Sequence, residues 1–184
     1  MSRRDHLREL LQAHVPSDAT EAVHLKGMRA LIEAPGDPFS REHFEPGHFT
    51  ASSFVLSPER DALLLILHSK LKRWLQPGGH VDPSDQTILL AARREVEEEV
   101  GLVGLPLALG PTIFDVDVHA IPPMRGEPAH QHFDVRFVFV APDRAATAGS
   151  DALAAQWVAL CEVHTVETDD SVLRAVRKLR SLGG

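Results

Sequence analysis

Residues 91–102 read AARREVEEEVGL, a segment that packs four glutamates into five positions and then reaches a glycine. Apolar residues recur through it at helical spacing, which predicts a helix from about residue 86 to 100. Gly101 stands where a glycine commonly follows the end of a helix. The helix should also have a separate apolar stripe that faces a core, formed by Leu89, Ala92, Val96 and Val100.

The acidic face of this helix is costly unless a cation neutralises it. Glu95, Glu98 and Glu99 share one face because they are spaced i, i+3 and i+4, whereas Glu97 points to the other side. Like charges at these spacings cost roughly 0.2–0.5 kcal/mol per pair. The negative end of the helix dipole adds about 0.3–1 kcal/mol per carboxylate. The pattern indicates either a solvated acidic patch or a site for Mg²⁺, which prefers oxygen ligands.

The loop before the helix favours the metal site. It reads PGGHVDPSD over residues 77–85, and its adjacent Gly78 and Gly79 let the backbone approach a ligand or a metal closely. Arg94 comes directly before the acidic face and can hold a loop carboxylate in a charge-assisted pair.

Gly79 followed by REVEEEVGL at residues 94–102 resembles the Nudix box of the Nudix hydrolases. That box ends in Arg-Glu, an aliphatic residue, any residue, Glu-Glu, any residue, Gly and an aliphatic residue, and every one of these positions matches. The loop departs from the pattern, because Asp85 stands where the box has a glutamate and one extra residue precedes Arg94. The departure concerns the internal salt bridge of the loop more than the metal-binding helix.

The resemblance implies a Mg²⁺-dependent hydrolase, with Mn²⁺ as a substitute, that cleaves a phosphoanhydride in a nucleoside diphosphate linked to another moiety. Carried over, Glu95 and Glu99 are the main metal ligands, and the Gly79 carbonyl is a further one. Glu98 is a ligand, directly or through water, and our candidate general base. The predicted catalytic residues are Glu98, Glu95 and Arg94. The alternative is a Nudix-fold module that has lost catalysis and senses a nucleotide or sugar, which the altered loop favours and the retained glutamates oppose.

The rest of the chain predicts an α/β fold, a mixed β-sheet sandwiched between α-helices. We expect an N-terminal helical extension over residues 1–46 and a Nudix domain over residues 47–184. The predicted helices cover residues 2–14, 18–33 and 169–182, and the predicted strands lie near 48–57, 61–69, 111–121, 131–140 and 156–160. The first two strands are separated by PERD, a turn signal, so we expect a hairpin.

Two of these strands alternate cleanly between apolar and polar residues. If they pair as neighbours, their polar sides share one face that bears His130, His132, Asp134, Arg136, Asp115, Asp117 and His119. One interpretation is that this is an ordinary solvent-exposed sheet face without a function. Our hypothesis is that the face lines a substrate cleft, with Arg136 taking phosphate and the histidines contacting substrate or a second metal. A sharper variant makes His130 and His132 part of a transition-metal site. The predicted substrate-binding residues are Arg136, His132, Asp134, His119, His130, Gly78 and Gly79.

The composition of the chain indicates which kinds of molecule the protein is expected to bind. The chain has 184 residues, 43% hydrophobic content and a formal charge of −7, which fits one globular domain and does not favour nucleic acid or an anionic membrane as partner. No apolar run approaches a membrane span, and one cysteine cannot form an internal disulfide, so we expect a cytoplasmic protein. The N-terminal helices are a candidate homodimer interface.

Overall fold

The computed structural model describes residues 1–124, 126–149 and 152–182. Its described part divides into two compact units. Unit 1 comprises Met1–Ser52, Gly79–Ala92 and Pro111–Phe137, and unit 2 comprises Ser53–Gly78, Arg93–Gly110 and Val138–Gly184. Strands β1 (Gly47–Leu56) and β6 (His130–Val140) and helix α3 (Ile88–Val100) run from one unit into the other.

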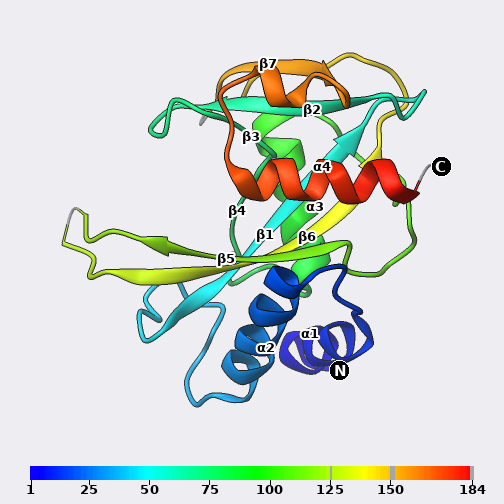
Figure 1. Cartoon of the computed structure of the whole chain (residues 1–184). Helices are drawn as coiled ribbons and strands as arrows, with labels where there is room; N and C mark the ends of the chain where they lie inside the picture. Colours follow the sequence, from blue (N-terminus) through cyan, green and yellow to red (C-terminus); the bar gives the residue numbers. More distant parts are fainter. Residues whose placement is uncertain (125, 150–151, 183–184) are drawn as a thin grey trace. The chain divides into compact units, whose positions relative to one another are not determined.

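Unit 1 holds the N-terminal helices α1 (Arg3–Ala13) and α2 (Ala19–Glu33), close to the predicted bounds. Helix α2 packs against α1 and against strand β5 (Asp115–Ile121), an arrangement visible in Figure 1. Buried leucines and a methionine of both helices supply the apolar contact: Leu7, Leu11, Leu25 and Met28. The helices therefore belong to the same compact unit as β5, and the predicted boundary after residue 46 stays a prediction.

Strands β5 and β6 pair antiparallel, as the shared polar face requires. The register runs from Asp115 opposite Arg136 to Ile121 opposite His130. Because alternate residues of a strand point to the same side, the polar residues of both strands lie on one face. The expected pairing of these strands is confirmed. Short strand β4 (Gly78–His80) pairs with β1, which lies next to β6 in the strand order.

Unit 2 is built around strand β2 (Ala62–His68), which pairs antiparallel with the end of β1 and with β3 (Trp74–Leu75). The predicted hairpin is confirmed. The leucine-rich centre of β2 is fully buried, as expected for a strand covered on both faces. Strand β7 (Ala152–Ala159) also pairs with β2, over nearly its whole length, and this long pairing explains why β7 starts earlier than the predicted residue 156.

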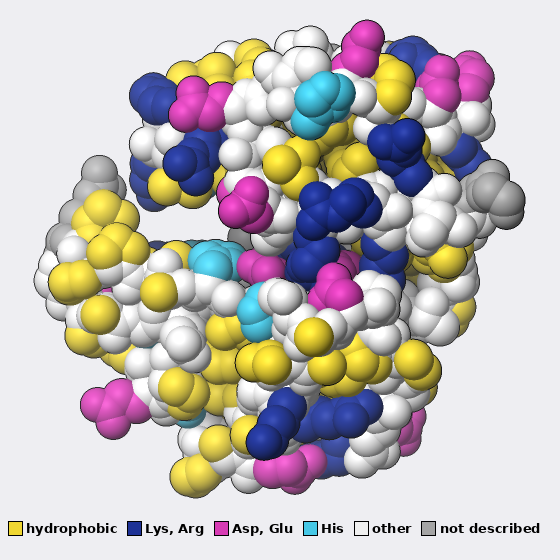
Figure 2. All heavy atoms as spheres, viewed as in Figure 1, with side chains coloured by type: hydrophobic (Ala, Val, Ile, Leu, Met, Phe, Trp, Pro, Cys, Tyr) yellow, Lys and Arg dark blue, Asp and Glu magenta, His cyan; other side chains and the backbone are white. Residues whose placement is uncertain are grey.

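The chain's last described elements in unit 2 are the 3₁₀ turn η1 (Val163–Thr165) and helix α4 (Asp170–Leu182). Figure 2 shows Lys and Arg side chains gathered over α4 on the viewed face. Val172, Ala175, Val176 and Leu179 of the same helix are buried, whereas Arg177 and Arg180 are exposed, so the helix is amphipathic; Arg174 is buried with the apolar residues. Among the residues that the structure describes, no helix has both the length and the hydropathy needed to cross a bilayer.

Candidate functional site

The acidic helix α3 forms as the sequence predicts, although it begins at Ile88 rather than near residue 86. Ala92, Val96 and Val100 of its apolar stripe are buried, and the N–H of Gly101 donates to the carbonyl of Glu97 at 3.0 Å. Gly101 has a φ of 71°, a left-handed conformation that glycine adopts without a steric penalty. The helix end that carries the glutamates is thus anchored by packing and by its cap.

Arg94 links two of the predicted metal ligands. Its Nη1 lies 2.9 Å from Oε1 of Glu95 and 2.9 Å from Oε2 of Glu98. The Glu95 side chain is only 12% exposed, whereas that of Glu98 is 54% exposed. The carboxylates of Glu95 and Glu98 therefore share the guanidinium of Arg94 at this face of the helix, and the Glu98 carboxylate remains open to solvent.

Glu99 connects the helix to the glycine loop. Its side chain is buried, and its Oε2 accepts a hydrogen bond from the N–H of Gly78 at 2.8 Å. The backbone directly before Gly79 is therefore held against a carboxylate of the acidic face. Oxygen donors from Glu95, Glu98 and Glu99 on adjacent turns are the hard ligand set that Mg²⁺ prefers, so the residues present fit this ion.

Gly149 supports the same helix end, and sequence reasoning did not single it out. Its N–H donates to the carbonyl of Glu99 at 2.7 Å, and the N–H of Thr147 donates to that of Val100 at 3.2 Å. A Cβ at position 149 would lie 2.0 Å from the carbonyl oxygen of Glu98. Only glycine allows this close approach, so the loop before β7 fixes the position of the last turn of α3.

The unusual Asp85 has a local role within its loop. Its Oδ2 accepts a hydrogen bond from the N–H of Asp82 at 2.8 Å, and its own N–H donates to the Asp82 carbonyl at 3.0 Å. The side chain is almost fully buried. An aspartate is short enough to close this turn on its own loop, which accounts for its tolerance at a position where the Nudix box has glutamate.

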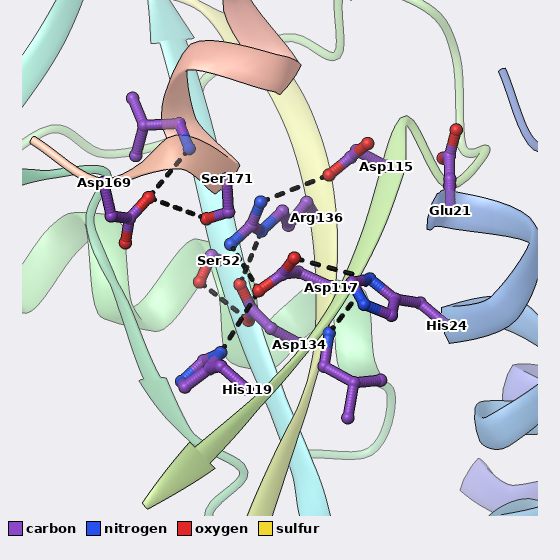
Figure 3. A network of polar contacts seen from close by, with 12 residues as sticks. Glu21, His24, Ser52, Asp115, Asp117, His119, Asp134, Arg136, Asp169 and Ser171 are labelled. Atoms are coloured by element: carbon purple, nitrogen blue, oxygen red, sulfur yellow. Dashed lines mark hydrogen bonds and ion pairs between the residues drawn. The ribbon is translucent and has the colours of Figure 1, made fainter. Parts of the chain in front are cut away.

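Arg136 is the centre of a buried ion-pair network in unit 1 (Figure 3). Its Nε donates to Asp134 at 2.8 Å, while its terminal nitrogens lie 3.2 Å from Asp115 and 3.5 Å from Asp117. The Arg136 side chain is 2% exposed. The polar face of β5 and β6 is therefore neither an exposed sheet face nor an open surface at this point. The predicted contacts of Arg136 and Asp134 with substrate would require this network to open.

Neighbouring side chains complete the network. Thr50 and Ser52 of β1 donate to the other carboxylate oxygen of Asp134 at 3.1 and 2.8 Å. His119 Nδ1 donates to Asp117 at 3.3 Å, and His24 of α2 lies 3.4 Å from the same carboxylate. Sequence reasoning missed His24, because only tertiary packing brings α2 to β5.

The charges in this network reinforce one another. Burial opposes the ionisation of Asp117, but the hydrogen bond from His119 and the charge of Arg136 prevail and hold the pKa of this carboxyl well below its usual range. Burial also opposes the charge of Arg136, but the surrounding carboxylates prevail and raise the pKa of its guanidinium. Both groups stay charged at neutral pH.

The histidines of the predicted face form one connected group of rings. His119 is 46% exposed, pairs with Asp117 and has its ring centroid 5.5 Å from that of His132. His130 and His132 contact each other and His48, and His80 contacts His48 and His132, with centroids of these pairs 4.8–5.3 Å apart. Sequence reasoning did not single out His48 or His80 for this cluster, since they come from β1 and β4.

A comparison with protein-family models matches the NUDIX domain to residues 47–177, which is most of the chain. This chain belongs to the Nudix family. The resemblance of residues 94–102 to the Nudix box is thereby confirmed. A comparison with curated protein sequences finds no match.

Solved structures resemble the chain over its Nudix domain. An Ap4A hydrolase from C. elegans is 18% identical with a TM-score of 0.55, covering 73% of this chain and 96% of its own. The NUDIX domain of NrtR from Shewanella oneidensis, complexed with ADP ribose, is 16% identical with a TM-score of 0.56, covering 74% and 88%. The E. coli dihydroneopterin triphosphate pyrophosphohydrolase is 16% identical with a TM-score of 0.55, covering 71% and 92%. At these identities the likeness establishes the fold, and it confirms the predicted α/β Nudix fold.

Proposed function

We propose that this Nudix protein is a Mg²⁺-dependent hydrolase that cleaves a phosphoanhydride bond in a nucleoside diphosphate linked to another moiety, or in a related nucleotide. The observations that support it most directly are that Glu95 and Glu98 share the guanidinium of Arg94 at one helix end and that Glu99 of the same end accepts a hydrogen bond from the backbone of Gly78. Three carboxylates at the negative end of a helix repel one another and the helix dipole. Bound Mg²⁺ offsets that repulsion, and Mn²⁺ can take its place.

Each ligand has a distinct part in the proposal. Glu95 and Glu99 are the principal metal ligands, as the Nudix box implies; both side chains are largely shielded from solvent. The carbonyl of Gly79 is the backbone ligand, since Gly79 follows the residue that Glu99 holds through its N–H. When bound, the metal spreads the negative charge that develops on the phosphoryl oxygens and makes a coordinated water more acidic.

Glu98 is the proposed general base and also a ligand, directly or through water. Its exposed carboxylate can accept a proton from an attacking water, which a buried carboxylate could not reach. Arg94 positions both Glu95 and Glu98 through its Nη1, so we assign it an orienting role. The proposed base and the residue that orients it both lie on α3.

The substrate side of the proposal rests on the glycine loop and the polar face of β5 and β6. The adjacent Gly78 and Gly79 let backbone groups approach a diphosphate closely. His119 is exposed enough to contact substrate without rearrangement. The remaining predicted substrate-binding residues lie deeper and stay predictions: His130, His132, Asp134 and Arg136.

The named ligands and substrates of the structural relatives favour this chemical class. Ap4A, ADP ribose and dihydroneopterin triphosphate all contain linked phosphate groups. We also propose that the protein is cytoplasmic and that it forms a homodimer through its N-terminal helices. The proposed domain division is a helical extension at residues 1–46 and a Nudix domain at residues 47–184.

A substrate screen tests the proposal. The purified chain is incubated with dinucleoside polyphosphates, nucleotide sugars, ADP-ribose, coenzyme A and nucleoside triphosphates, with and without Mg²⁺, and released phosphate species are measured. We expect turnover of at least one compound only in the presence of Mg²⁺ or Mn²⁺. Tight binding of a compound without turnover across the panel would instead identify the sensing module.

A further inference from the structure

Four histidines gather in unit 1. His48 lies on β1, His130 and His132 on β6, and His80 at the end of β4. One ring nitrogen from each of His48, His130 and His132 lies within 4.8 Å of the other two. His48 and His130 are buried and His132 is half-buried, so this cluster is part of the interior rather than a chance meeting of surface side chains.

The inner nitrogens of two of these rings are left without protein hydrogen bonds. Among the residues that the structure describes, neither Nε2 of His48 nor Nε2 of His132 has a hydrogen-bond partner, although both atoms are buried. A buried polar atom without a partner destabilises the folded state. A ligand bound by both nitrogens would remove this destabilisation.

Backbone carbonyls orient two of the rings. Metal-binding histidines are commonly held in the same way, by a hydrogen bond from the ring nitrogen that does not bind the metal. Nδ1 of His130 donates to the carbonyl of Pro128 at 2.8 Å, and Nδ1 of His48 donates to that of His43 at 3.3 Å. A donated Nδ1 proton leaves the lone pair on Nε2, which is the form that binds a metal. These carbonyls therefore set the tautomer before any ion arrives.

The chemistry of the ring nitrogens favours a transition ion. Imidazole nitrogens suit zinc and similar transition ions, whereas Mg²⁺ prefers oxygen.

We propose that His48, His130 and His132 form a binding site for one divalent transition ion of the zinc type, separate from the carboxylate site of α3. Metal–nitrogen bonds of about 2.1 Å require the three nitrogens to approach one another modestly, by ring rotation. Three histidine ligands leave a fourth position for solvent or substrate. Because its ligands come from two neighbouring strands, the ion ties β1 to β6 and stabilises unit 1.

Zinc titration of the full chain tests this site. Metal-free protein is titrated with Zn²⁺ by calorimetry in excess Mg²⁺, which occupies the carboxylates. We expect one Zn²⁺ per chain and a higher melting temperature in its presence. The His132→Ala and His130→Ala variants should lose at least about 100-fold in Zn²⁺ affinity. The matched control is His164→Ala, an exposed histidine of η1, which should bind Zn²⁺ as the wild type does.

Two further measurements complete the test. The first shows whether zinc is bound by the histidines or by the carboxylates of α3. The second shows whether a variant has lost a metal ligand or has failed to fold. The double variant Glu98→Gln/Glu99→Gln should keep its Zn²⁺ affinity, because the carboxylate site is not involved. Co²⁺ bound to the wild type should give the strong visible absorption of a nitrogen-ligated ion with four or five ligands, which does not depend on whether a variant folds. Absence of Zn²⁺ uptake by the wild type, unchanged affinity in a folded His132→Ala variant, or a weak Co²⁺ spectrum typical of six oxygen ligands would each overturn the proposal.

Discussion

Asp134 and Arg136, two positions apart on β6, are joined by a 2.8 Å hydrogen bond from the arginine Nε, and both side chains are almost fully buried. This pair anchors the carboxylates of Asp115 and Asp117 around one guanidinium. A buried charge with its counter-charge removed is far more costly than a surface charge. The network is therefore a structural centre of unit 1, whether or not substrate reaches it.

Removal of the guanidinium should destabilise the protein strongly. We expect Arg136→Ala to lower the free energy of unfolding by about 3–5 kcal/mol, because three buried carboxylates lose their common partner. Urea denaturation followed by circular dichroism measures the change. The control is Arg144→Ala, which removes an arginine that also pairs with two carboxylates, Glu59 and Asp61, but is 44% exposed. That variant should unfold nearly as the wild type does, and equal losses in both would contradict the structural role of Arg136.

Asp117 should contribute to acid sensitivity. Its folded-state pKa lies below the usual value of 3.8, so its contribution to stability is fully present above that value and is lost as the pH falls below it. Asp117→Asn should therefore be less stable than the wild type at pH 7, and the difference should shrink at pH 3. Thermal unfolding at both pH values measures this, and a constant difference would show that the charge of Asp117 does not matter.

Gly149→Ala should displace the glutamates of α3, although residue 149 itself lies in the loop before β7. The added methyl group would collide with the backbone of Glu98, so the last turn of α3 must move. A shift of about 1 Å in catalytic groups can reduce a rate on the order of 100-fold, and we expect kcat/KM to fall by about 10–100-fold. Gly27→Ala on α2 is the control, since its new Cβ would meet only ordinary contact at 3.5 Å from Phe133. Similar activity in both variants would mean that the loop does not position the helix.

Substitution of His119 tests whether the polar face of β5 and β6 binds substrate. If its exposed ring donates a hydrogen bond to substrate, His119→Ala should raise KM by about 3–10-fold with little change in kcat. Steady-state kinetics with whichever compound the screen identifies gives both constants. An unchanged KM would remove His119 from the substrate-binding residues.

The sequence predicted those features that short-range patterns determine. The hairpin of β1 and β2, the acidic face of α3 and the shared polar side of β5 and β6 all follow from spacing along the chain. Alternation shows which residues share a face, but not what covers it. Arg136 was therefore expected to face a cleft; its guanidinium pairs with buried carboxylates, one of which also accepts hydrogen bonds from Thr50 and Ser52.

Contacts between distant segments could not be predicted in the same way. His48 joins His130 and His132 only because β1 lies beside β6 in the strand order. Gly149 touches Glu98 through a loop some fifty residues further along the chain, and glycine has no side chain whose chemistry could signal the contact. The sequence offered an isolated histidine and an ordinary loop glycine at these positions.

Calorimetric titration of Mg²⁺, in the presence of a non-hydrolysable phosphoanhydride, tests the central claim that the acidic end of α3 is a metal site. Three proteins are compared: the wild type, Glu99→Gln, and Glu97→Gln, which removes a glutamate of the same helix from the exposed side opposite the site. We predict Mg²⁺ uptake by the wild type and by Glu97→Gln, and its loss in Glu99→Gln. Absence of uptake by the wild type, or equal uptake by all three proteins, would contradict the account.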